Sequence, residues 1–282
     1  MYESVTKRIE SIKQPYGGYI KISDFEKTVL DDGRVLNDGE NVSASVVGTV
    51  VDYLTRFIYT GNANDSFKIP MLGAKKAEDN GYHNAPIIAY SYFKEIHHSL
   101  DRKTIINACK LVYEFDVWYR STLAGISVAS KGIVVEPDNK TIENIAAMVN
   151  RGLEFFDLYG PIIQDGFTFE PPNSTREDYI NALKKGKTYG GYTPTVATGD
   201  GDFLTSDTLW DFKVLKKAPQ SKHTLQILVY WIMGQHSGQA IFKSISKIGI
   251  YNPRSNTVYR LSVSEVPSVI IKSIENEVIC YT

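Results

Sequence analysis

The chain has 282 residues, of which 43% are hydrophobic and 22% are charged, and its formal net charge is -1. This length and composition predict one large globular domain, or a domain that carries an insertion. The near-neutral charge excludes a global attraction to nucleic acid, so any such contact must rest on local basic patches.

The two cysteines, Cys109 and Cys280, are too few for a disulfide framework and exclude a four-cysteine iron–sulfur cluster within one chain. Free thiols are typical of a reducing compartment, so we expect a cytoplasmic protein. The N-terminal residues lead into no apolar run, and we expect neither a signal peptide nor a membrane span. A phosphate-binding Gly-x-x-x-x-Gly-Lys-Ser/Thr loop is also missing, which excludes an ATP-driven motor domain.

Residues 1–40 contain several glycine turn signals and are expected to be irregular. Residues 40–59 place apolar side chains at helical spacing and predict the first clear helix. Residues 60–187 are expected to form a helical insertion within a single domain that spans 1–282. Its helices are predicted at 84–98, 103–124, 139–159 and 175–186.

The pattern changes at residue 188, where extended segments begin. Residues 199–215 predict a strand, a short turn and a second strand. Residues 221–236 predict an amphipathic helix, 247–263 a hairpin, and a last helix starts at Pro267. Strands flanked by helices make an α/β layer structure.

The predicted hairpin carries a candidate site. Alternate side chains of a strand share a face, so Asp211 and Lys213 should point one way, exposed above an apolar layer. The turn can bring Asp202 close to Asp211, and two carboxylates that close repel each other unless a cation neutralises them. Hard oxygen ligands select Mg²⁺ or Mn²⁺. Lys213 would then activate the attacking water or neutralise charge on a phosphate.

These motifs together resemble the PD-(D/E)XK nuclease superfamily. The Gly-x-x-Asp that ends at Asp202 and the Asp-x-Lys at Asp211–Lys213 look like its motif pair. Gln226-x-x-x-Tyr230 is similar to a motif of the RecB-like and Cas4-like branch, here without the cysteines for an iron–sulfur cluster. In that branch an earlier helix often reads Gly-Thr-x-Val-His-x-x-Leu; residues 48–54 are similar, with Asp52 in place of the histidine. The resemblance covers residues 43–58 and 188–263 and does not explain the insertion.

The resemblance implies an α/β fold of the restriction-endonuclease type, with a mixed central sheet flanked by helices. It also implies a Mg²⁺-dependent deoxyribonuclease that hydrolyses phosphodiester bonds with a metal-activated water. The implied metal ligands are Asp52, Asp202, Asp211 and the carbonyl of Phe212. The implied catalytic residues are Asp202, Asp211, Lys213, Gln226 and Tyr230.

Basic residues flank the Asp-x-Lys strand and suit phosphate contacts, which give affinity without reading the base sequence. The candidates are Lys216, Lys217, Lys222 and His223. DNA is therefore the expected partner, and the helical insertion is a possible site for a protein partner.

Each part of this hypothesis has a simpler alternative. Asp200, Asp202 and Asp207 are residues that turns favour, and Asp200 competes with Asp202 as metal ligand. Asp211 and Lys213 alone would form an ordinary salt bridge, and Tyr230 would be a core residue. The alternative function is a catalytically silent nuclease-fold protein that binds nucleic acid or another protein in a phage or defence system.

Overall fold

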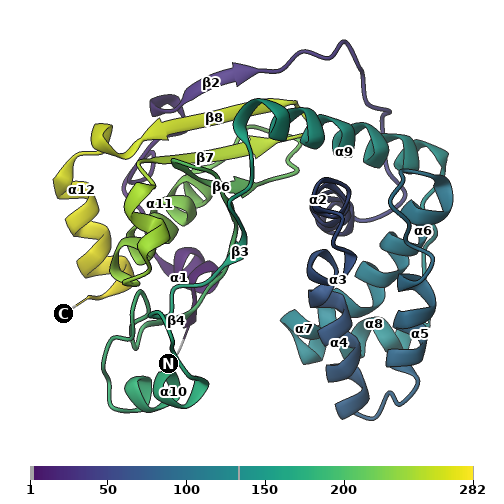
Figure 1. The fold of residues 1–282 in the computed structure, drawn as a ribbon, viewed down its shortest axis with the longest axis horizontal. Helices are drawn as coiled ribbons and strands as arrows, with labels where there is room; N and C mark the ends of the chain where they lie inside the picture. Colours follow the sequence, from purple (N-terminus) through teal and green to yellow (C-terminus); the bar gives the residue numbers. More distant parts are fainter. Residues whose placement is uncertain (1–2, 133, 282) are drawn as a thin grey trace. The chain divides into compact units, whose positions relative to one another are not determined.

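The computed structural model describes residues 3–132 and 134–281, which divide into two compact units. The first unit comprises residues 1–30 and 156–282, and the second comprises residues 31–155. The insertion was predicted for 60–187, whereas the chain divides near residues 31 and 155. Each unit is described by itself below (Figure 1).

The first unit contains a six-stranded mixed sheet within the described residues, in the order β2-β8-β7-β6-β5-β3. The strands are β2 (Glu26–Val29), β3 (Gln164–Phe167), β5 (Gly201–Leu204), β6 (Thr208–Phe212), β7 (Lys247–Asn252) and β8 (Thr257–Ser262). Strands β6 and β7 are parallel, and the other neighbours are antiparallel. A separate parallel pair joins β1 (Glu3–Ser4) to β4 (Val196–Thr198). The mixed α/β architecture predicted from the sequence is thereby confirmed.

The helices of this unit pack around its core, and the one at Ser221–His236 lies on the sheet (Figure 1). They are α1 (Val5–Ser11), α10 (Arg176–Lys184), α11 (Ser221–His236) and α12 (Ser268–Ser273), with a π-helical stretch at Ile274–Ile279. One sheet face packs Leu209 and Ile250 into a core that also holds Leu228 of α11. On the other face Trp210 contacts Tyr159, their ring centroids 5.5 Å apart. The central strand β6 is therefore buried on both faces, whereas the edge strand β2 is mostly exposed.

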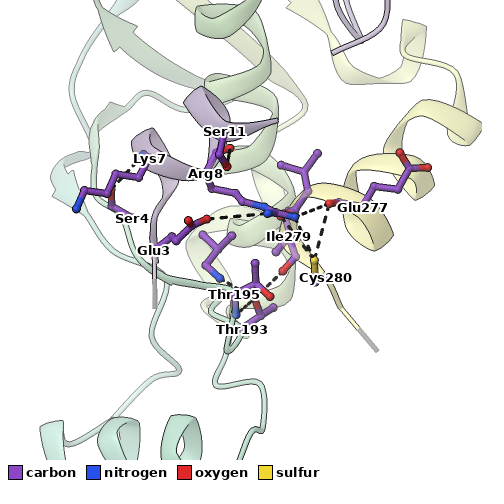
Figure 2. A network of polar contacts seen from close by, with 12 residues as sticks. Glu3, Ser4, Lys7, Arg8, Ser11, Thr193, Thr195, Glu277, Ile279 and Cys280 are labelled. Carbon is purple, nitrogen blue, oxygen red and sulfur yellow. Dashed lines mark hydrogen bonds and ion pairs between the residues drawn. The ribbon is translucent and has the colours of Figure 1, made fainter. Parts of the chain in front are cut away.

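Polar contacts join the start of this unit to its end (Figure 2). The Arg8 guanidinium of α1 donates to the carbonyls of Glu277 and Val278 at 2.8 and 2.9 Å. The Thr193 hydroxyl donates to the carbonyl of Ile279 at 2.6 Å. Since arginine offers donors in a fixed fork, these contacts set α1 against the C-terminal segment.

The second unit is helical. Its elements are α2 (Ala44–Thr60), α3 (Ala63–Ser66), α4 (Lys68–Asp79), α5 (Ala85–Phe93), α6 (Arg102–Leu111), a π-helical stretch at Val112–Asp116, α7 (Val117–Arg120), α8 (Thr122–Lys131) and α9 (Asn139–Tyr159), the last of which continues into the first unit. Gly73 lets α4 pack closely against the π-helical stretch, because a Cβ there would lie 1.9 Å from the carbonyl oxygen of Phe115. No helix among the described residues has the length and apolar character needed to cross a membrane.

Most predicted elements have counterparts, but the N-terminal entry and part of the predicted helical insertion differ. Helix α11 covers the predicted 221–236, and β7 and β8 form the predicted hairpin. The expected irregular entry instead contains α1 and β2, and β3 lies within the segment that was predicted to be helical. The two missed strands are short edge strands. Their sequences carry little alternation because an edge strand is held mainly by pairing with its neighbour.

Candidate functional site

The two predicted acids lie on neighbouring strands. Strands β5 and β6 pair Phe203 with Trp210 and Leu204 with Leu209, and the same register continued by one step sets Asp202 opposite Asp211. Directly opposed residues of an antiparallel pair share a face. The Asp202 carboxylate accepts the backbone N–H of Phe212 at 2.6 Å, which anchors Asp202 to the end of β6. The hairpin therefore places Asp202 and Asp211 at neighbouring positions on one face of adjacent strands, and their joint role as metal ligands stays a prediction.

Asp211 is buried rather than exposed, which corrects the expectation of an acid standing above the sheet. Its exposed fraction is 2%, because its face of β6 is the one that α11 covers. The Lys213 ammonium donates to Oδ1 of Asp211 at 2.8 Å and remains partly exposed. Oδ2 of Asp211 is buried and has no hydrogen-bond partner among the described residues.

Helix α11 contributes Gln226 and Tyr230, one turn apart. The Gln226 amide donates to the Tyr230 hydroxyl at 3.0 Å. Burial raises the pKa of Tyr230, and the negative charges of Asp211, Asp200 and Asp202 raise it further. The Tyr230 ring also packs on Phe169 with a centroid separation of 5.5 Å. Tyr230 is therefore a core residue, and its hydroxyl is close enough to the acids for their charges to act on it. A packing role and a role in the candidate site are compatible for this residue.

His223 lies in the first turn of α11. Burial lowers its pKa to about 4, the positive charge of Lys213 lowers it too, and the charge of Asp211 opposes this shift. The ring nitrogen Nδ1 accepts the backbone N–H of Gln220 at 2.9 Å. A neutral imidazole that accepts at Nδ1 carries its proton on Nε2, so His223 is a neutral donor beside Lys213 and Asp211 at pH 7.

Phe212 lies at the end of β6, and the lysines that follow lie on the surface. The Phe212 ring is buried against Tyr251, 5.4 Å between centroids, and its backbone lies between Asp211 and Lys213. Lys216, Lys217 and Lys222 are all exposed. Their side chains are accessible to a phosphate backbone, and their role in binding stays a prediction.

The other two acids of the hairpin region, Asp207 and Asp200, differ in their contacts and exposure. Asp207 lies in the turn between β5 and β6, where it accepts from Lys247 and from the Thr208 hydroxyl at 2.7 and 2.6 Å. These contacts suit the structural role expected of a turn residue. Asp200 is exposed one residue before β5, and its rivalry with Asp202 for a metal stays open.

Asp52 belongs to α2 in the second unit. Its two carboxylate oxygens accept from Nε and Nη2 of Arg56 at 3.0 and 3.2 Å. A cation bound by Asp52 would compete with this ion pair. Its role as a metal ligand stays a prediction.

Tyr192 supports the site, and the sequence analysis did not single it out. Its hydroxyl donates to the carbonyl of Gly199 at 2.7 Å, directly before β5. Burial raises the pKa of Tyr192, and the charges of Glu170 and Asp200 add to that shift. The signal in the sequence is the pair of tyrosines around Gly190-Gly191, just upstream of the acidic motif.

Within the described residues, no three His, Cys, Asp or Glu side chains converge as a metal-binding group. The donor set of the hairpin is therefore two carboxylates, with a lysine and a neutral histidine beside them. A scan against protein-family models, a search of curated proteins and a search of solved structures found no match to this chain.

Proposed function

We propose that this chain is a Mg²⁺-dependent nuclease that hydrolyses DNA phosphodiester bonds at the β5–β6 hairpin, on a restriction-endonuclease-like fold. The observation that carries the proposal is Oδ2 of Asp211, a buried carboxylate oxygen that receives no hydrogen bond from the described residues. A buried carboxylate oxygen without a hydrogen-bond donor is costly even when Lys213 pairs with the other oxygen, so Oδ2 favours a cation. Asp202, opposite it, offers a second hard ligand.

The residues suit magnesium. Mg²⁺ is commonly held by one or two carboxylates, and waters and substrate phosphates complete its octahedron. Asp202 and Asp211 would hold it, with the carbonyl of Phe212 as a further candidate ligand. When bound, the ion would lower the pKa of a water and polarise the phosphate.

The remaining groups act on the substrate phosphate. Lys213 places a positive charge beside Asp211, where it offsets the negative charge that develops on the phosphate in the transition state. His223 donates through Nε2 without adding charge at pH 7. Tyr230 remains protonated at neutral pH, and Gln226 fixes its hydroxyl. The exposed Lys216, Lys217 and Lys222 would bind neighbouring phosphates.

The setting that we propose is the cytoplasm. Both cysteines are free thiols, with Cys109 buried and Cys280 half-buried. Unpaired thiols suit a reducing compartment.

The test is cleavage of labelled linear and circular DNA in Mg²⁺, in Mn²⁺ and in EDTA. Lys213→Met should remove Mg²⁺-dependent cutting. The matched control is Lys247→Met, since Lys247 pairs with Asp207 at 2.7 Å in the same sheet but outside the candidate site. The proposal fails if the parent protein leaves DNA uncut, or if both lysine variants cut at the same rate as the parent.

A catalytically silent interaction module is the second candidate, and one observation favours it. Helix α5 exposes 72% of Ile87 and 60% of Tyr90, so the second unit presents apolar side chains to solvent. Exposed apolar patches often mark protein contacts. A parent protein that neither cuts nor binds DNA, together with a partner lost on Ile87→Ser, would favour this candidate.

A further inference from the structure

The loop that leads from α1 toward β2 holds one aromatic side chain fully in solvent. In the turn Pro15–Gly18 the N–H of Gly18 donates to the carbonyl of Pro15 at 2.8 Å. Gly17 and Gly18 have φ of 86° and 89°, values that favour glycine. Tyr16 stands at the corner of this turn with an exposed fraction of 105%. The next most exposed aromatic side chain among the described residues is Tyr90, at 60%.

The loop is seated on the first turn of α11. The Thr224 hydroxyl donates to the carbonyl of Ile20 at 2.8 Å, and the Ile20 side chain is part of the core. A Cβ on Gly18 would lie 2.7 Å from Cβ of Ser221, so only glycine allows this approach. Tyr16 is consequently presented from an anchored turn, which lowers the entropic cost of using it in binding.

Lysines lie in this loop and on the first turn of α11. A Cβ on Gly17 would be 3.1 Å from Cε of Lys21, so the stem of Lys21 lies against Gly17, the residue that follows Tyr16. Lys21 and Lys222 are both exposed. His223 of the same turn is close enough to Lys213 and Asp211 for their charges to act on it. The loop and the candidate site thus flank one turn of α11.

We propose that Tyr16 stacks on an unpaired base of a nucleic-acid strand that enters the site, while Lys21 binds the adjoining phosphate. Every base offers a π-face, so aromatic stacking combined with lysines binds single strands without a sequence preference. The inference rests on the proposed function and extends it to the substrate class, a single strand or a frayed end.

The test measures binding in EDTA, so that cleavage plays no part. Anisotropy of a fluorescein-labelled deoxythymidine oligomer, about 16 nucleotides long, gives Kd for the parent and variants. Tyr16→Ala and Tyr16→Leu should weaken binding about 5- to 150-fold, the range for loss of one stacked base. Tyr16→Phe should bind like the parent because it keeps the ring. Tyr90→Ala is the matched control and should also bind like the parent.

Two further readouts separate stacking from other contacts. Tyr16→Ala should leave the dependence of log Kd on log salt unchanged, whereas Lys21→Ala should reduce its slope by about 0.7. A blunt duplex offers no unpaired base, so its affinity should not change in Tyr16→Ala. A parent-like Kd for Tyr16→Ala on the single strand would overturn the inference and leave the nuclease proposal standing. No binding by the parent at low salt would overturn both.

Discussion

Each of the two units buries an aspartate, and the two carboxylates differ in how their oxygens are satisfied. Asp116 of the second unit is 5% exposed, and both its oxygens are engaged. The Tyr53 hydroxyl donates to Oδ2 at 2.7 Å, and Arg120 donates to Oδ1 at 2.5 Å. Asp211 of the first unit has Lys213 on Oδ1 and no hydrogen-bond donor on Oδ2 among the described residues.

Under the proposed function, this difference distinguishes a structural acid, Asp116, from a functional one, Asp211. Burying a charge costs free energy unless hydrogen bonds and an opposite charge compensate for it. Asp116 has both kinds of partner, a hydrogen bond from Tyr53 and the positive charge of Arg120, so no cation from solution is needed to compensate for its burial. Asp211 leaves one oxygen without a hydrogen-bond donor among the described residues, and its neighbours on the strand and helix are groups that would act on a phosphate under the proposed function. Stability should therefore depend on Asp116, and activity on Asp211.

The largest expected effect is on cleavage by Asp211→Asn. The substitution keeps the shape of the side chain and removes its charge, so Mg²⁺-dependent cleavage should fall about 100- to 1000-fold, as when one charge-stabilising group is lost from an active site. Urea unfolding should show only a small change in stability, because losing the partly exposed ion pair with Lys213 is offset by removing a buried charge whose Oδ2 has no hydrogen-bond donor among the described residues. Normal cleavage combined with lost stability would make Asp211 a structural residue like Asp116.

Asp116→Ala should have the opposite profile. It leaves the buried Tyr53 hydroxyl without its acceptor, which should lower the free energy of unfolding by about 1–3 kcal/mol. Cleavage per folded molecule should not change. Asp79→Ala is the control, since Asp79 forms an exposed pair with Lys75 at 3.4 Å and its loss should leave the stability close to that of the parent. Equal stabilities of the two variants would contradict a structural role for Asp116.

His223 should make stability depend on pH. Its folded-state pKa of about 4 lies below its ordinary value of 6.5, so between these values the unfolded chain binds a proton that the folded chain does not. Stability should fall as pH drops from about 6.5 toward 4. After allowance for solvent screening of this half-buried ring, the loss at pH 5 is about 1 kcal/mol. His223→Gln should remove that part of the difference between pH 7 and pH 5. An unchanged difference would mean that the folded protein protonates His223 normally.

Asp52→Asn should have the smallest effect. Because Arg56 engages both oxygens of Asp52, we expect an ordinary helical ion pair worth about 0.3–0.5 kcal/mol, and unchanged cleavage. A loss of cleavage as large as that of Asp211→Asn would instead make Asp52 a metal ligand, as the resemblance implied. The two variants should be compared in one assay across a Mg²⁺ titration.

The sequence by itself determined the elements whose signals are local. Helix α11 and the β7–β8 hairpin follow from periodicity and turn residues, which a short window of sequence contains. The identities of Asp202, Asp211 and Lys213 were also evident, because the two acids flank a turn and the lysine follows by two. Even the Asp52–Arg56 pair could have been predicted from its four-residue spacing.

Only the tertiary structure decided the burial of Asp211, because the cover comes from α11, and no local pattern states which sheet face a later helix will occupy. The same holds for β2 and β3, which are strands because β8 and β5 pair with them. It also holds for Tyr16, whose exposure follows from a turn seated against Ser221 and Thr224, about 200 residues away along the chain. Long-range packing sets the environment of a residue, and that environment makes Asp211 and Tyr16 candidates for function.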